Sequence, residues 1–339
     1  MIRLGVIGTG FIGSVHAENI AAHSRAELVS VYDIEPDRAR AVADKNGAGV
    51  ADSADALLSG SNIDAVIIAS STPTHVTYLK AAARAEKAIF CEKPVDIDWS
   101  RTQEAAAALK ASTVPIMMGF NRRFDPNYIE LQRQVRSGAV GKIEIVLMTH
   151  RGPALPPIDL LRVCGGHYRD SGVHFFDLLR WISDDEPEEI FVYGACLVDP
   201  VVAELGDADT SVISLRLSQG ALCHIDCSRR TAYGYDERIE VFGSGGMIES
   251  RRKRRRDISL YQGSSIIDNG LYPGWYERIK ESYVLELDAF IQALDQGVTP
   301  SPSLDDGLKA QAIAEAATES FKSGRPVRIS YNKGALVSH

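Results

Sequence analysis

The first 33 residues constrain the fold of this 339-residue sequence more than any other segment. An apolar run ends in Gly8-Thr9-Gly10-Phe11-Ile12-Gly13, and a helical stretch and a second apolar run follow. The spacing G-x-G-x-x-G between a strand and a helix is typical of a dinucleotide-binding βαβ unit. Gly8 permits the tight turn, Gly10 lets a pyrophosphate approach the backbone, and Gly13 lets the helix pack against the strand. The free N–H groups of the helix N-terminus would face the phosphates.

Asp33 ends the second apolar run, at the distance of about 20 residues from the fingerprint where an acidic residue binds the adenosine ribose. A carboxylate at this point accepts hydrogen bonds from the ribose diol and repels a 2′-phosphate. The sequence therefore predicts NAD, rather than NADP, as the cofactor.

The first third of the chain alternates strand-like apolar runs with helical stretches, which is typical of a doubly wound parallel sheet. We therefore expect a Rossmann domain over residues 1–120, with its ligands beyond the carboxyl ends of the strands. The predicted strands are 3–7, 27–32, 65–69, 88–91 and 116–119, and the predicted helices are 13–22, 36–46, 54–59, 74–85 and 99–111.

The remainder, 121–339, reads as an α+β domain with a large, open, mainly antiparallel sheet, because consecutive strand-like runs are joined by short turns. We expect it to bind the substrate and to mediate oligomerisation. The predicted strands are 143–149, 189–197, 210–217, 221–227, 238–242 and 258–262, and the predicted helices are 127–137, 170–182, 279–296 and 304–322. The fold class is thus α/β followed by α+β.

Composition narrows the classes of partner. A formal net charge of −8 disfavours nucleic acid and anionic membranes as main partners. The sequence has no apolar run of membrane-spanning length, and it enters its first strand without a signal-peptide pattern. Five cysteines without a C-x-x-C pair fit free thiols, and the alternation around Cys223 and Cys227 favours core packing over metal binding. We expect a cytoplasmic protein.

Glu92-Lys93-Pro94 follows a predicted strand of the cofactor half. A lysine beside a nicotinamide can hydrogen-bond a substrate oxygen and ease loss of the hydroxyl proton. Pro94 can adopt a cis peptide bond and so fix the orientation of Lys93. The alternative is an ordinary surface lysine in a loop.

Asp170 and His174 lie four residues apart in a predicted helix that begins after Gly165-Gly166, so they share one face. A histidine near a carboxylate is a suitable general acid or base. The alternatives are that Asp170 complements the helix dipole and that His174 packs between aromatic neighbours.

Together these motifs resemble the Gfo/Idh/MocA family, which includes glucose–fructose oxidoreductase and inositol dehydrogenase. The resemblance covers nearly the whole chain and is closest to the inositol 2-dehydrogenase branch. It rests on the fingerprint, Thr72-Pro73-Thr74-His75, Glu92-Lys93-Pro94, Gly119-Phe120-Asn121-Arg122-Arg123-Phe124-Asp125, Gly165-Gly166 with Asp170 and His174, and Tyr233-Gly234-Tyr235-Asp236.

The resemblance implies catalytic roles for Lys93, Asp170 and His174, with His174 as the base that takes the hydroxyl proton. It implies a homotetramer and no metal. The implied substrate-binding residues are Asn121, His150, Asp170, His174 and Tyr235. The implied cofactor-binding residues are Gly8, Gly10, Phe11, Ile12, Gly13, Asp33, Ser71, Thr72, Pro73, His75, Glu92, Lys93 and Arg122.

Three departures from the family pattern leave the substrate isomer open. Gly152 stands where the inositol branch often has Asn, and the loop 153–162, with Pro156-Pro157, does not align residue by residue with the family. His167, Tyr168 and Arg169 replace more apolar residues, and the roles of His167 and Arg169 are not evident from the sequence. All three departures bear on the substrate isomer and not on the type of reaction.

The expected function is NAD-dependent oxidation of a cyclic polyol, with myo-inositol converted to scyllo-inosose as the preferred reaction. The alternatives within the class are scyllo-inositol and an aldose or pyranose sugar. From other classes, an NAD-dependent glycosidase would turn over a glycoside without added NAD, and a non-catalytic NAD sensor would not need all of Lys93, Asp170 and His174.

Overall fold

The computed structural model describes residues 1–331, and these form two compact units. The first comprises 1–124 and 282–311, and the second comprises 125–281 and 312–331. The sequence predicted a functional division after residue 120, which stays a prediction. In packing, the chain returns to the first unit at Ser282. Within residues 1–331, no helix has both the length and the apolarity needed to cross a bilayer.

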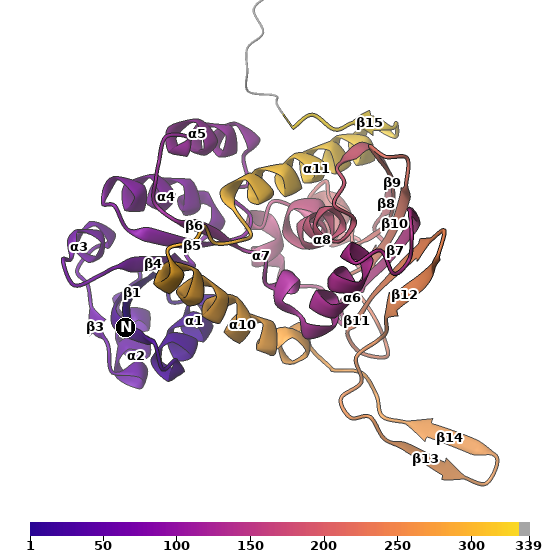
Figure 1. The fold of residues 1–339 in the computed structure, drawn as a ribbon, viewed down its shortest axis with the longest axis horizontal. Helices are drawn as coiled ribbons and strands as arrows, with labels where there is room; N and C mark the ends of the chain where they lie inside the picture. The colour runs from indigo at the N-terminus through magenta and orange to yellow at the C-terminus, as the bar shows by residue number, and fades with distance from the viewer. Residues whose placement is uncertain (332–339) are drawn as a thin grey trace, which may run out of the picture. The chain divides into compact units, whose positions relative to one another are not determined.

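The first unit contains a six-stranded parallel sheet in the order β3-β2-β1-β4-β5-β6 (Figure 1). This is the strand order of a doubly wound dinucleotide-binding domain, so the predicted fold is confirmed. Its strands are β1 Ile2–Ile7, β2 Ala26–Tyr32, β3 Gly49–Val50, β4 Ala65–Ile68, β5 Ala88–Glu92 and β6 Ile116–Gly119. Its helices are α1 Phe11–Ala22, α2 Pro36–Asn46, α3 Ala54–Ser59, α4 His75–Arg84 and α5 Trp99–Leu109, with short turns η1 Thr72–Thr74 and η2 Asn121–Phe124.

Helices cover both faces of this sheet. Leu4 and Val6 of β1 are buried in a core with residues of α1 and α2, whereas Gly5 between them faces Leu57 of α3. All four residues of β4 are buried, as expected for a central parallel strand. The two-residue strand β3 was not predicted, because so short a segment has no readable alternation.

The second unit contains a seven-stranded sheet in the order β12-β11-β7-β10-β9-β8-β15. β7 and β10 are parallel, and the other neighbouring pairs are antiparallel, which confirms the predicted mainly antiparallel sheet. Its strands are β7 Ile143–Arg151, β8 Pro187–Ala195, β9 Thr210–Leu217, β10 Leu222–Ser228, β11 Asp236–Gly243, β12 Gly246–Ser250 and β15 Val327–Arg328. Its helices include α6 Pro126–Arg136, α7 Ile158–Val163, α8 Val173–Ser183 and α9 Val201–Glu204.

One face of this sheet is covered by α6 and α8 (Figure 1). Cys223, Ile225 and Cys227 are buried on it, as their alternation predicted, and burial raises the pKa of the Cys227 thiol to about 12. The other face exposes apolar side chains, which include Ile145, Leu147, Val212, Phe242 and Met247.

Four predicted elements differ from the structure in their bounds or in where they pack. The helix predicted over 170–182 is a π-helical turn, η3 (Tyr168–Gly172), followed by α8. The strand predicted over 258–262 is β13 (Ser259–Gln262), which pairs with β14 (Ser265–Asp268) in a separate hairpin (Figure 1). The last two long helices are α10 (Trp275–Gln296) and α11 (Leu304–Ser323), and each contributes residues to both units.

Candidate active site

The glycine loop has the backbone that a diphosphate needs. Gly8 has φ +92°, and a Cβ there would lie 2.5 Å from the Ser70 backbone. A Cβ on Gly13 would lie 1.8 Å from the Gly8 carbonyl oxygen, whereas a Cβ on Gly10 would meet no atom within 4 Å. The open space therefore lies at Gly10, where the fingerprint requires close approach of the pyrophosphate. Phe11 and Ile12 begin α1 directly behind it.

Asp33 is held by hydrogen bonds from the chain's own backbone and from one hydroxyl. Its Oδ2 accepts from the Thr9 backbone N (2.6 Å) and Oγ1 (3.0 Å), and its Oδ1 accepts from the Glu35 backbone N (2.9 Å). Burial alone would raise the pKa of Asp33, but these hydrogen bonds and the Arg38 charge lower it below its ordinary value. The carboxylate stays ionised and suited to a ribose diol. Arg38 Nη1 lies 3.4 Å from Oδ1.

The loop after β4 carries Ser71, and Thr72 and Pro73 follow it in the turn η1. His75 follows it and is buried, with Nδ1 2.8 Å from the Pro94 carbonyl oxygen and Nε2 3.0 Å from the Ser70 carbonyl oxygen. The imidazole thus links the cofactor loop to the loop of Lys93. Burial lowers the pKa of His75, although both carbonyls oppose that shift. Its direct contact with the cofactor stays a prediction.

Lys93 follows Glu92 at the end of β5, and the Lys93–Pro94 peptide bond is cis, as predicted. Glu92 is anchored because its Oε1 lies 2.8 Å from Nε2 of buried His16. Glu286 is also close to this pair, and its pKa is raised by burial and by the negative charge of Glu92.

His16, Glu92 and Glu286 are ligand types that could hold a metal ion. However, the separation of 2.8 Å between His16 and Glu92 is a hydrogen-bond length, so a proton lies between them. The prediction of a metal-independent enzyme stays a prediction.

Asn121 and Arg122 follow β6 and are both buried. The Asn121 side chain donates to Ser282 Oγ (3.3 Å) and accepts from Arg122 Nη1 (3.1 Å). Their predicted roles at the substrate and the cofactor stay predictions. Within the first unit, the predicted residues gather at the carboxyl ends of its parallel strands, where ligands of such sheets bind.

In the second unit, His150 is the penultimate residue of β7, and Tyr235 directly precedes β11, the strand that pairs with β7. Tyr235 Oη donates to Glu237 Oε1 (2.8 Å) and lies 3.5 Å from His150 Nδ1. Glu237 is buried and was not predicted. Its spacing of two from Tyr235 is a signal that could have found it, because such residues share one face of a strand.

His174 lies in the first turn of α8, and Asp170 lies in η3 before it. The ring centres of Phe175, next to His174, and of His150 are 4.8 Å apart. The N-terminal end of α8 therefore packs against the C-terminal end of β7. Arg229, directly after β10, places Nη2 3.6 Å from Asp170 Oδ2. Arg229 was not predicted, because no sequence motif singles it out. π-helical turns are frequent at functional sites.

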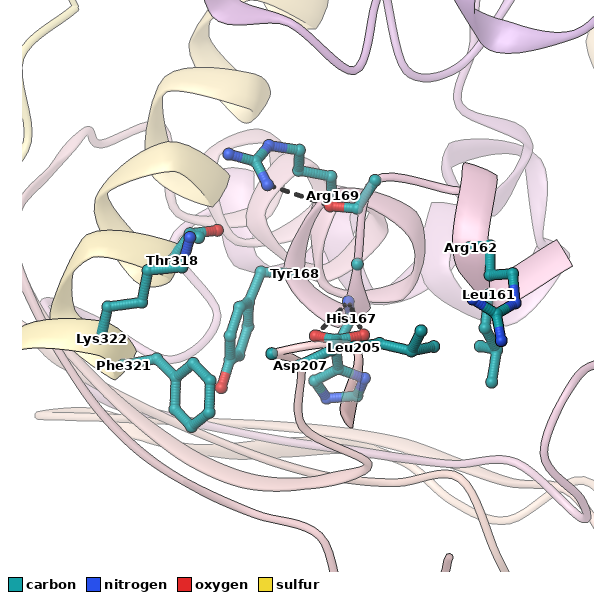
Figure 2. A pocket seen from close by; sticks show the side chains of 13 residues that line it. Leu161, Arg162, His167, Tyr168, Arg169, Leu205, Asp207, Thr318, Phe321 and Lys322 are labelled. Carbon is teal, nitrogen blue, oxygen red and sulfur yellow. Dashed lines mark hydrogen bonds between the residues drawn. The ribbon is translucent and has the colours of Figure 1, made fainter. Parts of the chain in front are cut away.

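A cavity of about 360 Å³ lies beside η3 (Figure 2). His167, Tyr168 and Arg169 line it, whereas Asp170 and His174 are not among its lining residues. Arg169 makes a two-pronged ion pair with Glu315 of α11, at 2.6 and 2.5 Å. This ion pair connects η3 to α11. It gives Arg169 a structural role, which was not evident from the sequence.

Comparisons with known proteins agree with this arrangement. The profile of an oxidoreductase family's NAD-binding Rossmann fold matches residues 2–120, and the profile of its C-terminal alpha/beta domain matches residues 132–329. The myo-inositol 2-dehydrogenase of Thermotoga maritima is 39% identical over 97% of this chain and 98% of its own.

Two further comparisons cover both halves of the chain. The inositol 2-dehydrogenase of Rhizobium meliloti is 37% identical over 97% of this chain and 99% of its own. A crystal structure of a probable dehydrogenase from Thermotoga maritima superimposes with a TM-score of 0.94, at 39% identity, over 97% of this chain and 99% of that one. The similarity therefore extends well beyond the glycine fingerprint.

Proposed function

This chain belongs to the Gfo/Idh/MocA family of oxidoreductases, with an NAD-binding Rossmann domain and a C-terminal α/β domain, and we propose that it oxidises myo-inositol to scyllo-inosose. The observation that carries the proposal is the similarity over nearly the full length to two inositol 2-dehydrogenases. The presence of Lys93, Asp170 and His174 in the family's motif positions supports it.

The proposed chemistry divides between the two units. NAD, when bound, accepts the hydride from the carbon that bears the reacting hydroxyl. His174 takes the hydroxyl proton, Lys93 orients the reacting oxygen and stabilises its developing charge, and Asp170 accepts hydrogen bonds from substrate hydroxyls. Gly8, Gly10, Gly13 and Asp33 hold the dinucleotide, and His150 and Tyr235 complete the substrate contacts.

Gly152 is the observation that favours a second candidate substrate. Gly152 follows β7 and donates its backbone N–H to the Ser228 carbonyl (2.8 Å). It has no side-chain amide to bind a hydroxyl, so scyllo-inositol or an aldose is the second candidate substrate.

The test is NADH formation by purified enzyme with myo-inositol, scyllo-inositol and a panel of aldoses, with His174→Ala as the inactive control. We expect the highest kcat/KM with myo-inositol. A higher value with scyllo-inositol or an aldose would replace the substrate but keep the reaction. Glycoside turnover without added NAD, or NAD binding without turnover of any polyol, would contradict the proposal.

We also propose that the enzyme is a cytoplasmic homotetramer. The exposed apolar face of the seven-stranded sheet supports self-association, because large apolar surfaces of this kind mark interfaces. The five free thiols, four of them buried, suit a reducing compartment. Light scattering after size exclusion should give the tetramer mass. Leu147→Glu on that face should dissociate it, whereas Val50→Glu on β3 should not. A wild-type monomer would contradict the assembly.

A further inference from the structure

Arg229 is buried beside Asp170, yet it lacks the contacts that a buried arginine normally makes. Only 5% of the residue is exposed. Neither Nη1 nor Nη2 makes a hydrogen bond to any residue of 1–331, and the separation of 3.6 Å between Nη2 and Asp170 Oδ2 is an ion-pair distance. Leaving the donors of a buried charge unsatisfied is costly.

Two other arginines of the same unit show the contrast. Arg169 binds both carboxylate oxygens of Glu315 at 2.6 and 2.5 Å, and Arg180 binds both oxygens of Glu186 at 2.5 and 2.8 Å. These are the two-pronged pairs expected where arginine has a structural role. Arg229 instead brings Nη2 within 3.6 Å of Asp170 Oδ2 without forming a two-pronged pair of this kind.

His167 holds Arg229 in this orientation. His167 Nδ1 accepts from Arg229 Nε (3.3 Å), while His167 Nε2 lies 3.1 Å from Ser211 Oγ. Because Nδ1 must accept, the proton of the neutral ring is on Nε2, which donates to Ser211. Burial, with the Arg229 charge, lowers the pKa of His167 to about 3, so the ring stays neutral and keeps this tautomer near neutral pH. In Figure 2 the His167 ring and the Arg169 side chain extend from the turn in opposite directions.

The backbone of Arg229 is also fixed. Arg229 directly follows β10, and its backbone N–H donates to the carbonyl of Asp209, the residue before β9 (2.8 Å). Ser211, His167 and Arg229 thus form a chain of contacts that ends at Asp170, and every member except Asp170 is buried. Asp170 is partly accessible, as a residue that meets a substrate must be.

We propose that Arg229, held by His167, is the positioning residue of Asp170. Its charge, 3.6 Å from Oδ2, orients the carboxylate so that Asp170 accepts hydrogen bonds from two or more hydroxyls of the polyol. This inference rests on the proposed function and adds to it the group that determines how tightly a polyhydroxylated substrate is held. The His167 that departs from the family pattern acts through Arg229 and does not touch the substrate.

The first test removes the charge. Arg229→Met should raise the KM for the polyol about tenfold or more, the size of one hydrogen bond to a charged group, and leave the Kd for NAD unchanged. Arg229→Lys should recover part of the loss. Arg180→Met is the control for loss of a buried arginine: it should lower the Tm and leave KM unchanged. Equal KM for wild type and a folded Arg229→Met would overturn the inference.

The second test uses amide replacements of His167. Asn places its oxygen near the position of Nδ1, so His167→Asn can keep the contact to Arg229. Gln reaches toward Nε2, so His167→Gln can keep only the contact to Ser211. We expect a low KM with Asn and a raised KM with Gln, and we expect this difference to vanish when Arg229→Met is added. Equal KM values for the two amides would overturn the inference.

These outcomes separate the two proposals. The wild type is assayed beside each variant, with Tm and NAD binding as checks of folding. If the wild type oxidises no polyol, the proposed function is wrong and this inference falls with it. If the wild type is active and the Arg229 and His167 variants do not differ in KM as stated, only this inference is wrong.

Discussion

Gly8, Gly10, Gly13 and Asp33 come from one βαβ segment, whereas His150, Arg229 and Tyr235 come from the ends of three strands of a second sheet. In the first unit, function depends on backbone conformation and free space, which a short motif specifies. In the second unit, it depends on side chains that meet only because β7 lies between β10 and β11. The proposed cofactor residues can therefore be predicted from local sequence, whereas the proposed substrate residues come together only in the fold.

The largest expected effect concerns proton removal in the second unit. His174→Ala should lower kcat about a hundredfold or more, the usual contribution of a positioned base. The Kd for NAD, measured by fluorescence titration, should stay unchanged, because the cofactor residues lie in the first unit. A matching loss of NAD affinity would break the division of roles between the two units.

The next effect tests the glycine loop with a matched pair. In Gly13→Ala the new Cβ would lie 1.8 Å from the Gly8 carbonyl oxygen, so the loop must distort; in Gly10→Ala it would meet no atom within 4 Å. We expect Gly13→Ala to lower the Tm and to weaken NAD binding. We expect Gly10→Ala to keep its Tm and to weaken only NAD binding, by about tenfold. A lowered Tm for Gly10→Ala would contradict our view that its space serves the cofactor.

A smaller effect concerns the choice between NAD and NADP. Arg38 already lies 3.4 Å from Asp33, so Asp33→Ser alone should remove the repulsion and free a partner for the 2′-phosphate. The ratio of kcat/KM for NADP to that for NAD should rise about tenfold. Adding Arg38→Ala should reverse most of the gain. Equal use of both cofactors by the wild type would contradict the role of Asp33.

The smallest effect is a pH dependence of stability from His167. Its folded-state pKa of about 3 lies below the ordinary value of 6.5, so the unfolded chain binds more protons between these values. Stability should therefore fall as the pH drops below about 6.5, by about 1 kcal/mol at pH 5.5. His75, whose pKa is also lowered by burial, acts in the same direction. The Tm of His167→Asn, followed from pH 7.5 to 5.5, should fall less than that of the wild type.

The sequence predicted what is encoded locally. Strand alternation placed Cys223 and Cys227 in the core, where the structure has them, and the fingerprint and Asp33 predicted the cofactor loop. Arg229 could not be assigned in this way, because its neighbours Asp170 and His167 are distant in sequence and meet it only in the folded sheet. The sequence also did not show that α10 is shared between the two units. Leu287 and Phe290 pack in the core of the first unit, but an amphipathic pattern does not say which sheet a helix covers. The π-helical turn at Tyr168–Gly172 has no sequence signal known to us.

The parallel pairing of β7 with β10, within an otherwise antiparallel sheet, has a consequence for how such an enzyme can change its substrate. Because both strands run in the same direction, Ser228 pairs with Arg151 at their C-terminal ends. The segments that follow the two strands therefore leave the sheet side by side. These two connections can vary in length and composition while the ladder behind them is preserved. The two connections also contact each other, since the Gly152 N–H donates to the Ser228 carbonyl (2.8 Å) and Arg151 Nη1 donates to Tyr233 Oη (3.3 Å). A substitution in one connection that changes the specificity is therefore expected to need a matching substitution in the other.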